Sequence, residues 1–183
     1  MNPAQLKKAI NYPLSDLDIQ KILKPNKTNI IQYPDLAKVQ DLNTIFDKLG
    51  RCIVFIPLSP TFGHWCCLLK RPNNIIEWFD PYGIAPDKEK NWISKSVLKK
   101  LHEDKPYLTN LLRRANEQYG TRIMYNRHKW ESEREGVSTC GRWVALVCLL
   151  YNKSLDEIND MIKESNLAPD TFATYLTYNL LGN

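Results

Sequence analysis

Short runs of apolar residues dominate the middle of the chain, whereas both ends show helical spacing. Residues 51–58 (RCIVFIPL), 64–71 (HWCCLLKR) and 74–80 (NIIEWFD) are rich in β-branched and aromatic residues. Turn residues separate these runs, so each predicts a strand. Their apolar positions do not alternate cleanly, which is typical of a sheet covered on both faces. Residues 121–126 (TRIMYN) predict a further strand.

The first fifty residues predict helices. In LSDLDIQKIL, Ser15 is the expected N-cap and Asp18 the third helical residue, which is a capping-box pattern. In DLAKVQDLNTIFDKLG the apolar residues recur on one helical face, and Gly50 stands where that helix would stop. This face contains Leu36, Val39, Leu42, Ile45, Phe46 and Leu49.

Helical spacing returns after the third predicted strand. Segments 90–103 and 106–119 place apolar residues at helical intervals. Residues 140–151 (CGRWVALVCLLY) are almost wholly apolar and long enough for a buried helix, with Ser138 or Thr139 as its N-cap.

Two further helices complete the pattern. Ser154 and Glu157 form a capping-box pair, and Asp170 opens the last helical run, TFATYLTYNLL. These elements predict an α+β fold, in which helices flank a small central mixed β-sheet.

Composition predicts one globular domain. The chain has 183 residues, of which 43% are apolar and 25% charged. We divide it into a helical N-terminal part (1–50), a core (51–151) and C-terminal helices (152–183). We expect no membrane span, because no run approaches ~20 apolar residues, and no secretory signal. Five cysteines, an odd number, suggest free thiols, and a net charge of +5 permits a polyanionic partner without requiring one.

Cys140 is the first candidate for chemistry. It begins the predicted buried helix, where the helix dipole and the unpaired N–H groups can activate a nucleophilic sulfur. Gly141 follows, and its lack of a side chain lets the backbone approach a substrate closely. Cys140 is therefore either a nucleophile or a core cysteine, whereas Cys148, in the middle of the apolar run, better fits a core position.

The predicted hairpin supplies a base and an acid. With Pro72 and Asn73 at the turn, Trp65 pairs with Asp80, and His64 lies one step beyond. Asp80 can then accept a hydrogen bond from His64 and stabilise its imidazolium form. We expect the two to meet even if the register shifts by a residue or two. In isolation, Asp80 in DPYG better fits a residue that starts a turn.

Other titratable residues suit other roles. His102 in LHED fits a solvated helix end, and His128 lies in a charged stretch typical of a loop. A zinc site built from His64, Cys66, Cys67 and Asp80 is disfavoured, because Cys66 and Cys67 point to opposite faces of a strand and cannot easily bind one ion. We expect no metal and no cofactor.

Three motifs occur in order along the chain: GHW (63–65), FDPYG (79–83) and STCGRWV (138–144). This His…Asp…Cys-Gly order resembles the clan of cysteine proteases that includes the adenovirus maturation protease and the SUMO-specific proteases. The TCGRW form, preceded by VS, looks most like the maturation proteases of large DNA viruses and virophages. The resemblance implies a single cysteine protease domain of the adenovirus-protease type, a circular rearrangement of the papain fold.

The resemblance also implies a role for each candidate residue. Cys140 would be the nucleophile, His64 the general base and Asp80 the acid that orients it. Trp65 and Gly141 would lie against the substrate.

The chain departs from this family at the oxyanion hole, where the family uses a Gln side chain. No Gln lies between Asn126 and the nucleophile, and Glu131, after Trp130, matches better than Glu133. An ionised Glu would repel the developing oxyanion. Glu131 is either protonated and able to donate, or is replaced by Trp130, Trp65 or Asn126 as donor, or marks a weakened enzyme.

Three functions follow from these features. The first is an endopeptidase that cleaves after small residues, at Gly-Gly or Ala-Gly sites, and matures viral capsid precursors. The second is an isopeptidase that removes ubiquitin-like proteins, and the third is a weakened fold that binds capsid protein or nucleic acid. We favour the first, with a protein substrate, a DNA or peptide activator as an option, no membrane partner, a monomeric state, and a location in the virion and the cytoplasmic virus factory.

Overall fold

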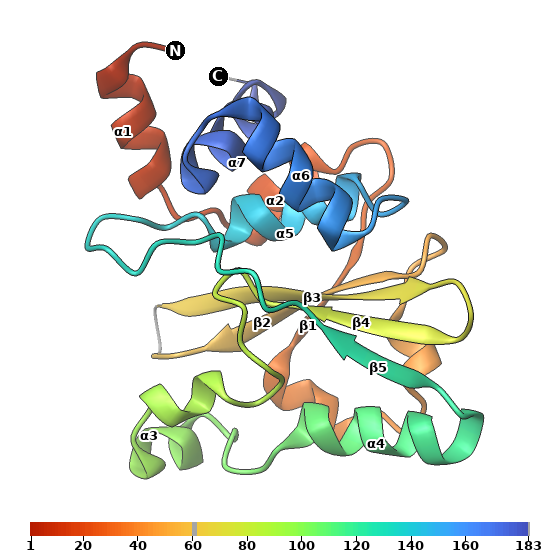
Figure 1. Cartoon of the computed structure of the whole chain (residues 1–183). Helices are drawn as coiled ribbons and strands as arrows, with labels where there is room; N and C mark the ends of the chain where they lie inside the picture. Colours follow the sequence, from red (N-terminus) through yellow and green to blue (C-terminus); the bar gives the residue numbers. More distant parts are fainter. Residues whose placement is uncertain (60–61, 183) are drawn as a thin grey trace.

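A five-stranded mixed sheet runs through the computed structural model, which describes residues 1–59 and 62–182 (Figure 1). The strands lie side by side in chain order. The two central pairings are antiparallel, and each edge strand runs parallel to its neighbour. The strands are β1 (Asn29–Gln32), β2 (Arg51–Pro57), β3 (Gly63–Arg71), β4 (Ile75–Phe79) and β5 (Arg122–Tyr125).

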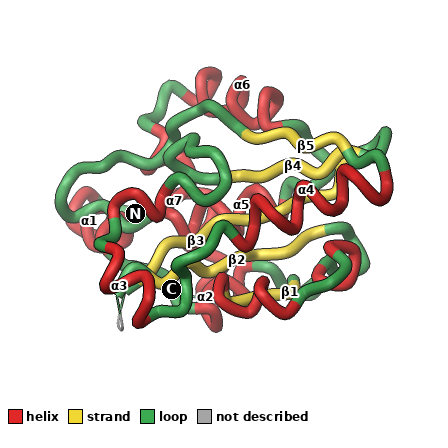
Figure 2. Tube along the Cα trace, turned by 90° about the horizontal axis from the view of Figure 1, so that it is seen from below, coloured by secondary structure: helices red, strands yellow, loops and turns green. Residues whose placement is uncertain are grey.

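Helices cover both faces of this sheet, so the α+β class predicted from the sequence is confirmed (Figures 1 and 2). On one face lie α1 (Pro3–Asn11), α2 (Asp16–Ile22), α5 (Cys140–Leu149), α6 (Leu155–Ser165), α7 (Pro169–Tyr178) and the 3₁₀ helix η4 (Asn179–Leu181). On the other lie α3 (Lys95–Lys100), α4 (Tyr107–Tyr119) and the 3₁₀ helices η1 (Tyr33–Lys38), η2 (Leu42–Ile45) and η3 (Glu89–Trp92).

The pleat of β3 sends alternate side chains into two separate cores. Cys67 packs with α5, whereas Cys66 packs with α4, as the sequence predicts for neighbouring strand residues. Within the described ranges, no helix is long and apolar enough to cross a membrane.

Side-chain caps account for several helix boundaries. The predicted capping box forms at α2, where Ser15 accepts from the N–H of Asp18 and the Asp18 carboxylate accepts in return. The same reciprocal pair forms at Ser154 before α6. The helix predicted after β4 is divided into η3 and α3, because Ser94 accepts from the N–H of Val97 and starts a new helix.

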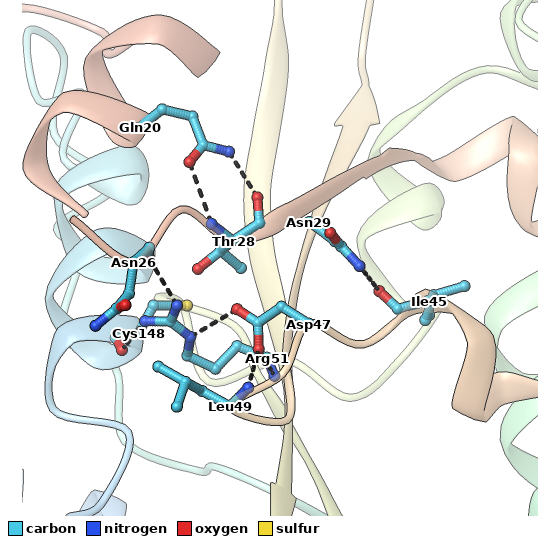
Figure 3. Close-up of polar contacts among 9 residues, drawn as sticks. All are labelled: Gln20, Asn26, Thr28, Asn29, Ile45, Asp47, Leu49, Arg51 and Cys148. Carbon is cyan, nitrogen blue, oxygen red and sulfur yellow. Dashed lines mark hydrogen bonds and ion pairs between the residues drawn. The ribbon is translucent and has the colours of Figure 1, made fainter. Parts of the chain in front are cut away.

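The region between α2 and β2 differs from the single helix expected there. It contains the edge strand β1 and the short helices η1 and η2. Asp41 accepts a hydrogen bond from the N–H of Asn43. Asp47 accepts from the N–H groups of Leu49 and Arg51 (Figure 3). Aspartate side chains thus provide local partners that compete with helical hydrogen bonding. The apolar face survives in part, since Leu36, Leu42 and Ile45 are buried in the core against α4.

Two buried arginines tie distant segments to α5. Arg51 on β2 donates to the carbonyl of Cys148, near the end of this helix (Figure 3). Arg142 donates to the carbonyl of Ala9 in α1 and to the hydroxyl of Thr177 in α7. Burial lowers the pKa of Arg142. Because an interior guanidinium without acceptors is costly, these bonds fix α5 relative to both ends of the chain.

The β3–β4 hairpin is shifted by one residue from the predicted register. Leu68 pairs with Trp78, so the loop Pro72–Asn74 contains three residues rather than two. A one-residue shift moves side chains to the opposite face of a sheet. The predicted pairing would have sent His64 and Asp80 to opposite faces, whereas the observed pairing places both on one face. His64 and Asp80 meet as predicted despite the one-residue difference in register, with Nε2 of His64 3.1 Å from Oδ2 of Asp80.

Candidate active site

A cavity of about 840 Å³ lies where three elements meet: the start of β3, the end of β4 and the start of α5. His64, Glu131, Cys140 and Trp65 all line it. A ring nitrogen of His64, a carboxylate oxygen of Glu131 and the sulfur of Cys140 lie within 4.8 Å of one another. The structure thus brings together residues that are widely separated in the sequence, and Asp80 lies behind the histidine ring.

His64 is held between an acid and an aromatic ring. Its Nε2 lies 3.1 Å from Oδ2 of Asp80, and the two side chains are 3% and 0% exposed. This leaves Nδ1 as the nitrogen available to Cys140. Tyr82 stacks on the imidazole with ring centroids 5.1 Å apart. Burial opposes the imidazolium charge, but the hydrogen bonds with Asp80, Cys140 and Cys66 outweigh it. They raise the pKa of His64 well above its ordinary value.

Asp80 is bonded through every polar group that it has. Its Oδ1 accepts from the N–H of Tyr82 (2.7 Å), and its Oδ2 also accepts from the thiol of Cys66 (3.3 Å). Asn126 accepts from the N–H of Asp80 and donates to its carbonyl, at 2.9 and 2.8 Å. That carbonyl also accepts from the N–H of Gly83. Asp80 therefore both starts a turn and orients His64.

Cys66 belongs to this arrangement, although the sequence analysis gave it no role there. Burial, reinforced by the charge of Asp80, raises the pKa of Cys66 well above its ordinary value. The neutral thiol is therefore the form that donates to Asp80. The alternation of strand residues could have revealed it, because Cys66 lies two residues after His64 and shares its face.

Glu131 occupies the N-terminal end of α5. Its Oε1 accepts from the N–H groups of Thr139 (2.8 Å) and Cys140 (3.0 Å). Its Oε2 has no hydrogen-bond partner among the described residues, although the residue is only 2% exposed. Burial raises the pKa of Glu131 to about 7, although His64 and the two N–H groups act in the opposite direction. The carboxylate thus accepts the hydrogen bond from the Cys140 N–H, which is the backbone donor that an oxyanion at Cys140 would need.

Two details at the start of α5 go beyond what the sequence predicts. Thr139 occupies the N-cap position, but its hydroxyl donates to Asp170, and neither Ser138 nor Thr139 caps the helix with its side chain. Gly141 is buried and is not among the residues that line the cavity. A Cβ there would lie 2.9 Å from Cβ of Leu14, so glycine allows α5 to pack closely against the N-terminal segment.

The other side chains considered as oxyanion donors are engaged elsewhere. The indole of Trp65 donates to the carbonyl of Leu14, and that of Trp130 donates to a side chain on α6. The amide of Asn126 donates to the carbonyl of Asp80. Glu131 is therefore the side chain that contacts the backbone donor of the nucleophile.

A comparison with known proteins places the chain among viral relatives. The sequence matches no known family model. It is 32% identical over 177 residues to the uncharacterized protein V9 of Sputnik virophage, with 94% of this chain and 98% of V9 covered. The chain belongs to the V9 family. Because V9 itself is uncharacterized, membership of the V9 family indicates a viral relative but no activity.

Solved structures offer only distant likenesses. The central domain of the Legionella pneumophila protein Lpg1148 is 14% identical, with 92% of this chain and 98% of that one covered and a TM-score of 0.39. The C-terminal protease domain of Ulp1, solved with the yeast SUMO ortholog Smt3, is 12% identical, with 100% and 96% covered and a TM-score of 0.43. Values this low do not identify a function for the chain.

Proposed function

We propose that this chain is a cysteine endopeptidase in which Cys140 is the nucleophile, His64 the general base and Asp80 the orienting acid. The observation that carries this proposal is the geometry of the three side chains. The Cys140 sulfur and a His64 ring nitrogen lie within 4.8 Å at the cavity, and the other side of the ring is bonded to Asp80. A thiol, a base and an orienting carboxylate in this order constitute an activated nucleophile.

The reaction follows from these positions. Nδ1 of His64 takes the thiol proton while the Cys140 sulfur attacks the peptide carbonyl, and the imidazolium then gives this proton to the departing amine. Water hydrolyses the thioester with His64 again as base. The Cys140 N–H can stabilise the oxyanion once Oε1 of Glu131 withdraws from it.

The substrate that we propose is a protein with small residues before the cleaved bond. Aromatic rings form much of the cavity wall, and such a wall excludes large side chains. Because V9 comes from a virophage, we extend the proposal to viral capsid precursors cleaved in the virion or the virus factory by a monomeric enzyme. The lining aromatic residues are Phe55, Phe62, Trp65, Tyr82 and Trp92.

The test uses capsid precursor protein and mass spectrometry of new chain ends. We expect new C-termini at small residues with wild-type protein and none with Cys140→Ala. Cleavage of a ubiquitin-like protein from a lysine side chain, without cleavage of the precursor, would instead indicate an isopeptidase.

Labelling with a thiol-reactive peptide electrophile provides a second test. The other four cysteines are buried, and Cys140 alone is partly exposed. We expect one label, on Cys140, and its loss in His64→Ala. No label on folded protein would contradict both hydrolase functions and favour a binding role.

A further inference from the structure

Two sets of potential metal ligands share His64 among the described residues. One combines His64 with Glu131 and Cys140, whereas the other combines it with Cys66 and Asp80. The ligand atoms in each set lie within 4.8 Å of one another. The first set lines the cavity, whereas Cys66 and Asp80 lie in the interior and are bonded to each other. The first set is therefore the one that adjoins the cavity.

Glu131 provides independent support for a ligand at this position. Its Oε2 is buried beside the cavity without a partner among the described residues, whereas Oε1 is fixed by two backbone N–H groups. An unpaired carboxylate oxygen in such a place is costly unless a donor or a cation meets it. The bonds to Oε1 hold the carboxylate beside the cavity, where Oε2 can meet such a group.

We propose that His64, Glu131 and Cys140 bind one Zn²⁺ ion, whose fourth coordination position opens into the cavity. Imidazole, carboxylate and thiolate are all zinc ligands, and three protein ligands with one open position are common in accessible zinc sites. Zn²⁺ bonds to the sulfur as the thiol proton passes to solvent, with no change of oxidation state. This set differs from the strand cysteines that the sequence analysis weighed for zinc.

The geometry needs only a small adjustment. Zinc bond lengths of about 2.0–2.3 Å and tetrahedral angles place ligand atoms ~3.3–3.7 Å apart. Side-chain rotation can close the remaining gap from 4.8 Å. The hydrogen bond between Nε2 of His64 and Asp80 supplies the carboxylate partner that zinc-bound histidines commonly have.

The consequence rests on the proposed function: bound Zn²⁺ occupies the nucleophile and blocks cleavage until a chelator removes it. Glu131 is the specific element, because a glutamine at this position would offer a neutral amide oxygen in place of a charged one. Metal binding itself does not depend on any protease activity and can be measured without substrate.

Co²⁺ titration under reducing conditions tests the site, because cobalt substitutes for zinc and reports its ligands in the absorption spectrum. We expect one Co²⁺ per chain, with a sulfur-to-cobalt charge-transfer band that Zn²⁺ abolishes by displacement. Cys140→Ser should remove the band, and Glu131→Gln should weaken binding by ~10–100-fold. Cys148→Ala, at a buried core cysteine on the same helix, is the matched control and should keep the band. Circular dichroism verifies that each variant is folded.

Three outcomes would overturn the proposal. They are a band that persists in Cys140→Ser, a band lost in Cys148→Ala, and equal affinity in wild type and Glu131→Gln. Failure of the protein to cleave any substrate, with the cobalt results as expected, would reject the proposed function and leave the metal site standing.

Discussion

The candidate site has two walls that are built differently. On the hairpin wall, both carboxylate oxygens and both backbone groups of Asp80 have partners. The other wall is the loop before α5. There, Oε1 of Glu131 accepts a hydrogen bond from the N–H of Cys140, and Oε2 has no partner among the described residues. The proposed base, His64, is therefore already held in place, whereas the proposed oxyanion side must rearrange before it can stabilise charge.

The largest effect is expected where the two walls meet, at Cys140. Cys140→Ala should reduce cleavage by about 10⁴-fold or more, because neither wall can act without a nucleophile. Peptide hydrolysis measured against Cys148→Ala checks this, since Cys148 lies on the same helix in the core. If Cys140→Ala keeps more than a tenth of the activity, another residue is the nucleophile.

Glu89, at the start of η3, contrasts with the fully bonded Asp80. It is fully buried, and neither carboxylate oxygen has a partner among the described residues. Burial raises its pKa from 4.5 to about 8, and the charges of Asp87 and Asp80 add to this, although His64 acts in the opposite direction.

Glu89 should therefore make wild-type stability fall as the pH rises. The folded state keeps the Glu89 proton that the unfolded chain releases near pH 4.5, so stability decreases from there until the pH passes about 8. Glu89→Gln should lack this decrease and be more stable near pH 8 by roughly a few kcal/mol. Urea unfolding of both proteins and of the exposed control Glu135→Gln measures it. Parallel curves for Glu89→Gln and wild type would contradict the prediction.

Asn126→Ala should weaken the positioning of Asp80 on the hairpin without changing a residue that lines the cavity. It leaves the N–H and carbonyl of Asp80 without their amide partner, which costs about 1–3 kcal/mol of stability. We expect kcat to fall roughly tenfold with little change in KM, because the tilt of His64 depends on Asp80. Asn116→Ala, which removes a similar amide bond to the backbone of Thr121, should lose stability but keep kcat. Equal kcat values in the two variants would assign Asn126 a purely structural role.

Glu131→Gln should make the loop before α5 better able to stabilise the oxyanion. The amide keeps an acceptor for the backbone N–H groups and adds a donor that can face the oxyanion. With chelator present, we expect turnover to rise by about tenfold or more, since one donor replaces one opposing charge. Glu133→Gln is the control on the same loop. Rates within twofold of wild type for both Glu131→Gln and Glu131→Ala would show that this side chain takes no part.

The sequence predicts the placement of His64 and Asp80 on the hairpin better than that of Glu131 on the loop before α5. Turn residues and apolar runs place His64 and Asp80 near each other, because both lie on one local hairpin. They do not fix the register, since PNN accommodates a loop of two or three residues. A loop of two residues and a loop of three differ by one residue in register, and this difference decides whether His64 and Asp80 share a face of the sheet.

The loop wall depends on contacts that local patterns do not encode. The hydroxyl of Thr139 donates to Asp170 across 31 positions of the chain, and Oε1 of Glu131 accepts from the N–H of Cys140. The segment before α5 has no periodicity that could indicate them. Glu131 could be selected only through the resemblance to a family that has glutamine there, and its role as a helix cap emerged only in the folded chain.

The anchoring of Arg142 has a consequence for the order in which the molecule is assembled. Its acceptors lie in the first and last α-helices, on Ala9 and Thr177, so the helix that carries Cys140 is fully packed only after α7 has been synthesised. A nascent chain that still lacks α7 already contains His64, Asp80 and Cys140 but leaves one side of their supporting helix uncovered. If the proposed activity depends on this packing, hydrolysis should therefore appear only once α7 has been synthesised.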